Sequence, residues 1–360
     1  MRAAQRVGLW DRVDDLVSPD RDLDDLRAHH LQLLAANRWR RLGVPVPEEL
    51  LVEERGFVAR RLAVDVVLRK VRESTGGPII VFKGPEAAAH YPDAGMRPFV
   101  DIDLLVPDPE EARRRLLAAG FVNFGNQEDY YDGLHHVQPL RWSRLPLSIE
   151  LHYHPNWIIW APPPPSSQLF EDAVPARVGP SGISALSPAK HALVLAVNSW
   201  TDVPLRRVLD LVDIAAVLGT LDPASVQPLA DQWDVGHVWK TTISAMNDLL
   251  FDGPRPLSVR TWARATASVR DETVGENHVR RLAATFWALP LHRAPRLFLQ
   301  MLAGEFLPSD AEDWRSKLNR ISVALRNAFR RRSQHDLMLG DDAQRLPRRA
   351  PTAGERGTTG

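Results

Sequence analysis

The chain has 360 residues, with 45 basic and 45 acidic side chains, no formal net charge and no cysteine. The length predicts two domains with small additions, and the balanced charge argues against a general nucleic-acid binder or a protein of anionic membrane surfaces. The lack of cysteine excludes a disulfide scaffold, a cysteine zinc site, an iron–sulfur cluster and a thiol nucleophile. No signal sequence or membrane-spanning run is visible, so we expect a cytoplasmic protein.

Residues 1–76 are predicted to form an N-terminal helical segment. Apolar residues between 23 and 34 recur at helical spacing, and the stretch 43–47 interrupts the pattern with a glycine and two prolines. A second helix is predicted from about 48 to 71, and the glycines and proline at 76–78 stop it.

Residues 77–156 are predicted to form a small mixed β-sheet. Runs of apolar and β-branched residues predict strands at 79–82, 99–106, 134–142 and 147–153. A turn and a short helix follow the first strand, and a helix that runs to about 119 follows the second.

The rest of the chain divides into a predicted linker, a helical domain and a tail. Residues 157–186 are interpreted as a linker because they contain four consecutive prolines, and residues 333–360 have the composition of a disordered tail. We therefore predict the α+β class, with the active site in the cleft between the sheet and the helical domain at 187–332. Helices are predicted there at 188–200, 205–219, 225–233, 236–250, 259–270, 277–288, 293–305 and 310–332.

Acidic residues occur within two of the predicted strands, which are otherwise mainly apolar. Because side chains alternate along a strand, Asp101 and Asp103 share one face, and the opposite face of that strand is wholly apolar. Glu150 takes the same kind of position in the middle of the strand at 147–153. If the two strands are neighbours, three carboxylates converge, and such a cluster can hold two Mg²⁺ ions. An acidic pair on a surface edge strand is the alternative.

Lys83 and Gly84 follow directly after the first predicted strand. A glycine at this turn allows backbone N–H groups to approach a triphosphate, and the lysine could pair with phosphate oxygens. A solvated turn lysine is the alternative reading of Lys83.

Several runs together resemble a known family. Val81–Gly84, Tyr91–Pro92 and Arg97–Val106 are similar to the Leu-Lys-Gly and Arg-Pro-x-x-Asp-Ile-Asp-Leu-Leu-Val signature of an uncharacterised nucleotidyltransferase family. That family is part of the DNA polymerase β-like, or minimal, nucleotidyltransferase superfamily. Ile149–His152 is similar to its third-carboxylate strand, and Leu205–Ile214 to its helical C-terminal half. The resemblance covers about residues 10–330.

The resemblance implies roles for five residues. Asp101 and Asp103 would be metal ligands shared by a catalytic ion and a nucleotide-bound ion, and Glu150 would bind the catalytic metal and help to deprotonate the attacking hydroxyl. Lys83 and Gly84 would bind the β- and γ-phosphates. The chain departs from the superfamily here, since lysine replaces a small residue and a proline follows the glycine.

The activity implied by the resemblance is transfer of a nucleoside monophosphate from a nucleoside triphosphate, with ATP expected, to an acceptor hydroxyl. The acceptor would be a small molecule, a peptide or a protein, and two Mg²⁺ ions would be the cofactors. A catalytically inactive binding or regulatory protein with the same fold, and a two-metal phosphohydrolase, are the alternatives.

Three further residues are candidates with weaker signals. Arg97 precedes Asp101 by four residues and could contact phosphate or pair with a carboxylate. His152 shares the polar strand face with Glu150 and could contact the substrate. Asp213 lies off the apolar stripe of its helix, where it could face the acceptor or simply form an ion pair. The nearby histidines 135, 136, 152 and 154 also permit a zinc site, but the acidic set favours magnesium.

Overall fold

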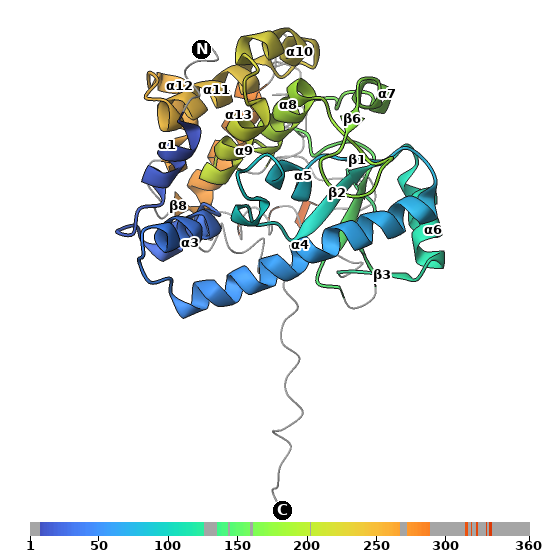
Figure 1. The fold of residues 1–360 in the computed structure, drawn as a ribbon. Coiled ribbons are helices and arrows are strands. Elements are labelled where there is room, and N and C mark those ends of the chain that lie inside the picture. The colour runs from blue at the N-terminus through green and yellow to red at the C-terminus, as the bar shows by residue number, and fades with distance from the viewer. Residues whose placement is uncertain are drawn as a thin grey trace, which may run out of the picture.

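The computed structural model describes residues 8–125, 135–142, 145–158, 161–201, 203–266 and 272–288, and residues 314, 315, 318, 322, 329, 331 and 332 beyond them. It confirms the α+β class: a seven-stranded mixed sheet has helices before and after it in the chain (Figure 1). Within the described residues, none of the helices combines the length and the apolar character that crossing a membrane requires.

The N-terminal segment is helical, as predicted, and the predicted break at 43–47 is present, but the run predicted as helical over 23–34 is split at 29–31 into two helices. Asp22 caps one helix by accepting hydrogen bonds from the N–H groups of Asp24 and Asp25, and Gly76, in the left-handed region at φ 68°, ends the last. The helices are α1 (Leu9–Leu16), α2 (Leu23–Ala28), α3 (Gln32–Arg41) and α4 (Glu48–Thr75).

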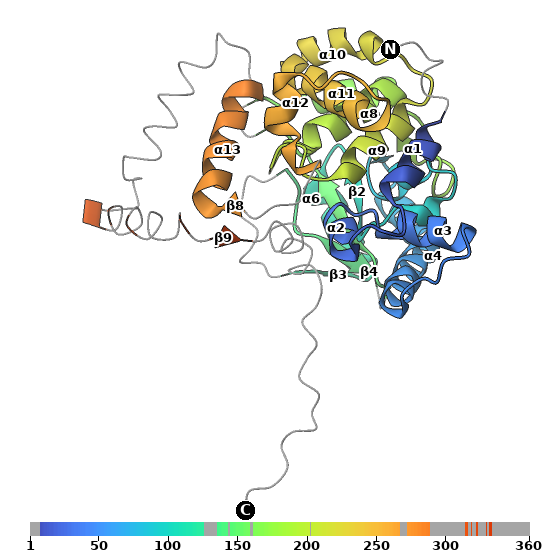
Figure 2. The ribbon, with the colours of Figure 1, turned by 90° about the vertical axis from the view of Figure 1, so that its left-hand side faces the viewer.

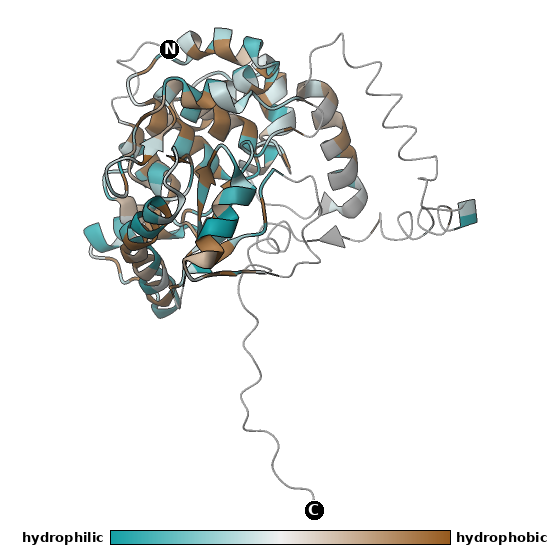
Figure 3. Cartoon of the chain, turned by 90° about the vertical axis from the view of Figure 1, so that its right-hand side faces the viewer, coloured by the Kyte–Doolittle hydropathy of each residue, from teal (hydrophilic) through white to brown (hydrophobic). Residues whose placement is uncertain are grey.

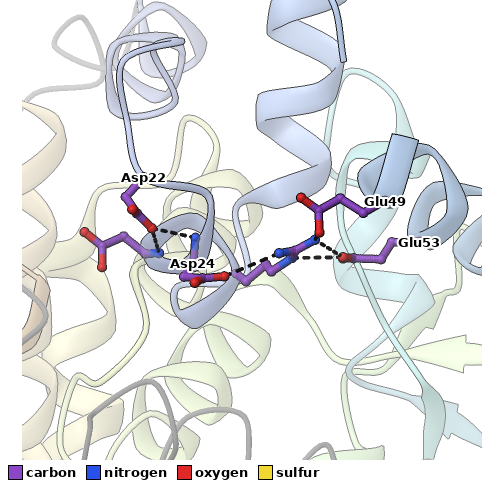
Figure 4. Close-up of polar contacts among 6 residues, drawn as sticks. Asp22, Asp24, Glu49 and Glu53 are labelled. Atoms are coloured by element: carbon purple, nitrogen blue, oxygen red, sulfur yellow. Dashed lines mark hydrogen bonds and ion pairs between the residues drawn. The ribbon is translucent and has the colours of Figure 1, made fainter. Parts of the chain in front are cut away.

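An arginine on α2 connects this helix to α4. Arg27 forms ion pairs with Glu49 and Glu53 at 3.0 and 2.7 Å and with Asp24 of its own helix at 3.3 Å. Figure 4 shows Asp24 on one side of these contacts and Glu49 and Glu53 on the other. The shared cation thus links α2 to α4.

The sheet has the strand order β3-β4-β5-β2-β1-β7-β6. The pairs β2–β5 and β1–β7 are parallel and the other pairs are antiparallel. The strands are β1 (Ile80–Val81), β2 (Asp101–Leu105), β3 (Phe121–Asn123), β4 (Leu140–Trp142), β5 (Ser148–His152), β6 (Val174–Pro175) and β7 (Ser184–Ala185).

The four strands predicted from the sequence are present, each shorter than its apolar run, but three others were not predicted. β3 follows α6 directly, and β6 and β7 lie inside the segment 157–186 that was interpreted as a linker. That segment therefore completes one edge of the sheet, since β7 pairs with β1. Strands of two or three residues are too short to produce an alternating pattern, and these three, unlike β1, lie in no continuous apolar and β-branched run that could have indicated them.

The two faces of the sheet pack against different helices. Ile102 and Leu104 of β2 lie in one apolar cluster with Val67 and Leu68 of α4 and with α6, whereas Leu105 lies in a second cluster with the C-terminal helices. The polar face of β2 is thus directed toward the helical half of the molecule, and α4 runs across the opposite side (Figure 1). Between the strands lie α5 (Pro85–Ala88), the 3₁₀ turn η2 (Ala94–Met96) and α6 (Pro109–Ala118).

The C-terminal half is mainly helical over its described part, as predicted, but Arg331–Arg332 form a strand paired with Glu272–Thr273, where the helix at 310–332 was predicted to end. Its helices surround a core of apolar side chains. Figure 2 shows α8 to α12 grouped together, and Figure 3 shows that hydrophobic and hydrophilic segments alternate along the helices. The predicted helix at 293–305, most of the one at 310–332 and the predicted tail at 333–360 lie outside the described residues. The elements are α7 (Ser166–Phe170), α8 (Pro188–Asn198), α9 (Val208–Leu218), η4 (Pro223–Val226), α10 (Gln227–Gln232), α11 (Gly236–Leu250), α12 (Leu257–Trp262), η5 (Arg264–Thr266), α13 (Val274–Ala288) and the pair β8 (Glu272–Thr273) and β9 (Arg331–Arg332).

One buried acid connects α5 to the chain before β7. Glu86 is 1% exposed, and its two carboxylate oxygens accept hydrogen bonds from the backbone N–H of Arg177 at 3.3 and 3.0 Å. Burial raises the pKa of Glu86 from 4.5 to about 7, because a low-dielectric surrounding disfavours the charged form, and the Arg177 contact offsets this only in part.

The raised pKa of Glu86 makes folding stability depend on pH. The folded state holds this proton more tightly than the unfolded state, so the stabilisation is fully present below pH 4.5 and is lost as the pH rises through about 7. Relative to Glu86→Gln, the wild-type free energy of unfolding should therefore fall by about 3 kcal/mol between pH 4.5 and pH 8. Urea unfolding of both proteins across this range measures the difference. Glu73→Gln, at an exposed position of α4, should follow the wild-type curve, and parallel curves for wild type and Glu86→Gln would contradict the prediction.

Candidate active site

The strands that carry the acidic residues are neighbours, as the site hypothesis required. β2 and β5 pair in parallel, with Asp103 opposite Glu150 and Asp101 opposite Ser148. The apolar residues that alternate with them, such as Ile102 and Ile149, are fully buried in the cluster on the other face. Asp103 and Glu150 therefore project from the same side of the sheet at the same level.

The close group in the structure consists of two carboxylates and a histidine. Asp103, Glu150 and His152 each place one potential ligand atom within 4.8 Å of the others. His152 Nε2 lies 3.1 Å from Asp103 Oδ1 and 3.6 Å from Glu150 Oε2, and its side chain has no exposed surface. Asp101 lies two residues earlier on the same face of β2 and outside this group. Of the three carboxylates predicted to converge, Asp103 and Glu150 lie in the close group, and His152 is its third member.

The imidazole of His152 compensates the charges of its neighbours. Burial alone would lower the pKa of His152, but its hydrogen bonds to Asp103 and Glu150 raise that pKa above its usual value. Burial alone would likewise raise the pKa of Glu150, but the contact with His152 holds it below the usual range. The raised pKa favours the protonated form of His152, whose positive charge offsets the carboxylates beside it.

Two more histidines, His135 and His136, lie next to this group. His136 forms an antiparallel bridge with His152, and its Nε2 lies 3.8 Å from Glu150 Oε2. The ring of His135 stacks on that of His152, with their centroids 5.4 Å apart. His135 and His136 are adjacent in the sequence, but no sequence pattern indicates that they lie close to Glu150. Their position depends on the register in which this segment pairs with β5.

The turn after β1 lies against the strand that carries the aspartates. Gly84 has φ 56° and ψ −115°, a conformation that glycine adopts far more readily than other residues, and a Cβ atom there would lie 2.7 Å from the backbone oxygen of Asp101. Glycine is thus required for this close approach. Lys83 is half-buried beside it. Burial raises the pKa of Asp210 on α9, and the charge of Lys83 is one of those that oppose this shift.

Arg97 and Asp213 form a buried ion pair with each other. The guanidinium donates from Nε to Asp213 Oδ1 at 2.8 Å and from Nη2 to Oδ2 at 2.7 Å, and the Tyr91 hydroxyl donates to Oδ1 at 2.6 Å. Arg97 Nη1 also donates to the backbone oxygens of Gly84 and Pro98 at 3.2 and 3.1 Å. The sequence left open whether Arg97 contacts phosphate and Asp213 faces the acceptor, or whether each forms an ion pair. The structure shows the ion pair, which joins α9 to the Gly84 turn.

Arg60 of α4 is a residue that the sequence analysis missed. Its guanidinium is half-buried over the ring of Phe57, with Cζ 5.1 Å from the ring centroid. Burial lowers the pKa of Arg60, and the negative charge of Asp101 opposes this effect. A cation from the N-terminal helices therefore contributes to the field at Asp101, which no local pattern in α4 indicates.

Comparison with known proteins agrees with this geometry. A family model described as an uncharacterised nucleotidyltransferase matches residues 17–250, which include β1 to β7, both aspartates, Glu150 and Asp213. A search of curated proteins and a search of solved structures each found no match. The match extends over well more than half of the chain, and the chain therefore belongs to this family of nucleotidyltransferases.

Proposed function

We propose that the protein transfers a nucleoside monophosphate from a nucleoside triphosphate, with ATP as the first candidate, to a hydroxyl group of a small molecule, a peptide or a protein. The observation that carries the proposal is the pairing of Asp103 with Glu150 across two neighbouring parallel strands, in a chain of this family. Both carboxylates project from the face of the sheet that is directed toward the C-terminal helices.

The donor set suits divalent cations. Two buried carboxylates at one level repel each other, and in the absence of an ion the cation of His152 offsets their charge. We propose that Asp101, Asp103 and Glu150 hold a pair of Mg²⁺ ions. When bound, such ions neutralise the charge that develops on the phosphates and favour ionisation of the attacking hydroxyl.

The residues of the chain have distinct proposed roles in the reaction. The acceptor oxygen forms a bond to the α-phosphorus, the bond from that phosphorus to pyrophosphate breaks, and Glu150 receives the proton of the hydroxyl. Lys83 and the N–H groups of the Gly84 turn bind the outer phosphates. Arg97 and Asp213 are positioning residues, because their polar groups already bind each other and the Gly84 turn.

The test is incubation of the full-length protein with each nucleoside triphosphate, Mg²⁺ and a small-molecule or peptide extract. We expect pyrophosphate release that depends on acceptor, together with adducts whose mass has increased by one nucleoside monophosphate. Release of inorganic phosphate without adducts would instead indicate a phosphohydrolase. Nucleotide binding that depends on the metal but is followed by no product would indicate an inactive binding protein. Either result would overturn the proposal.

A further inference from the structure

Four side chains form what we call the histidine–carboxylate cluster: Asp103, Glu150, His136 and His152. Three distances between their polar atoms are 3.1 Å (Asp103 Oδ1 to His152 Nε2), 3.6 Å (Glu150 Oε2 to His152 Nε2) and 3.8 Å (Glu150 Oε2 to His136 Nε2). Ligands about 2.1 Å from a tetrahedral ion lie roughly 3.4 Å from one another. The spacing of Asp103, Glu150 and His152 is therefore already close to that of three ligands of a four-coordinate ion. His136 lies beside Glu150 but outside this close group, and a shift of its ring would bring it in as the fourth donor.

The surroundings of the cluster hold the imidazole rings in position. His136 Nδ1 lies 2.7 Å from the backbone oxygen of Val137, which can only accept, so the neutral ring carries its lone pair on Nε2, toward Glu150. A hydrogen bond from the other ring nitrogen to a carbonyl is typical of metal-binding histidines. The ring of His152 is held by an edge contact with Phe82, 5.3 Å between centroids, and by the stacked ring of His135.

We propose that the histidine–carboxylate cluster binds a first-row transition-metal ion, with Zn²⁺ as its representative, more tightly than Mg²⁺. Imidazole nitrogen is a good ligand for such ions, whereas Mg²⁺ prefers oxygen donors in a six-coordinate arrangement. The inference rests on the proposed function for its catalytic meaning and changes it at one point: the position at Asp103 and Glu150 takes a transition-metal ion in place of one of the two Mg²⁺ ions. On binding, the proton that His152 Nε2 shares with Asp103 passes to solvent.

The test is a metal titration of the full-length protein after chelator treatment, without nucleotide or acceptor. Co²⁺ serves as the probe because its visible absorption reports the ligands directly. We expect one Co²⁺ per chain to bind with absorption bands of a four-coordinate site, Zn²⁺ to displace it stoichiometrically, and Mg²⁺ in large excess to displace little of it.

Two variants and one control locate the nitrogen donors. His152→Gln and His136→Gln should each weaken Co²⁺ binding by about tenfold or more and shift the absorption bands. His136 is half-buried, so its variant covers the possibility that the fully buried His152 position does not tolerate glutamine. His154→Gln is the matched control: its Nδ1 contacts the oxygen of Pro155, it forms no ion pair with Asp103 or Glu150, and its Co²⁺ affinity should equal that of wild type.

The outcomes separate this inference from the proposed function. Unchanged Co²⁺ affinity in both cluster variants, displacement of Co²⁺ by Mg²⁺ at similar concentrations, or no Co²⁺ binding would each overturn the inference. None of these measurements involves nucleotidyl transfer, so a failed transfer assay with intact Co²⁺ binding would overturn only the proposed function.

Discussion

Replacement of Asp103 by asparagine is expected to lower the rate of nucleotidyl transfer by about 10²–10³-fold. Asparagine keeps the size of the side chain and an oxygen near His152, but it removes the negative charge opposite Glu150. If that charge holds a cation, the stabilisation of the transferring phosphate is lost with it. Steady-state pyrophosphate release at saturating triphosphate and Mg²⁺ measures the effect.

The same assay distinguishes a catalytic from a structural role of this carboxylate. Glu150→Gln should reduce the rate by a similar factor, and the double variant should be little slower than either single one, because residues that hold the same ions act as a unit. Asp108→Asn is a matched control at the exposed N-cap of α6, where asparagine caps equally well, and should keep wild-type activity. Near wild-type activity in folded Asp103→Asn would contradict the metal role.

The location of this site follows from sequence only in part. Alternation within β2 and β5 was enough to predict that Asp101, Asp103 and Glu150 lie on polar strand faces, and the pairing of the two strands is confirmed. The register that puts Asp103, rather than Asp101, opposite Glu150 is set by tertiary contacts and has no local signal. For the same reason nothing in the sequence indicated that His152 lies in the close group with Asp103 and Glu150.

The helical half was easier to predict than the sheet edge. Helices such as α8 and α11 contain several turns, so their apolar periodicity is visible in the sequence, whereas β6 and β7 contain two residues each. Arg97 and Asp213 are separated by 116 positions, and no periodicity connects them. Asp213 lies off the apolar stripe of α9, and it is buried because Tyr91 and Arg97 cover it.

Replacement of Asp213 by alanine is expected to lower the free energy of unfolding by about 3–5 kcal/mol. The substitution leaves the guanidinium of Arg97, which is 7% exposed, buried without its counter-charge, and it also removes the acceptor of the Tyr91 hydroxyl. Urea unfolding at neutral pH measures the loss. Because Arg97 Nη1 binds the oxygen of Gly84, we also expect a lower transfer rate in the fraction that remains folded.

A double variant distinguishes the net contribution of the ion pair to the free energy of unfolding from the penalty of leaving one buried charge unpaired. Arg97→Met combined with Asp213→Leu removes both charges and replaces them with apolar groups of similar size, so it should be more stable than Asp213→Ala alone. Glu54→Ala is the control for an exposed pair: Arg40 and Glu54 lie 2.7 Å apart at the surface, and the loss there should stay below about 1 kcal/mol. Equal losses in Asp213→Ala and Glu54→Ala would show that water reaches the Arg97 guanidinium, and that α9 is not fixed to the Gly84 turn through this ion pair.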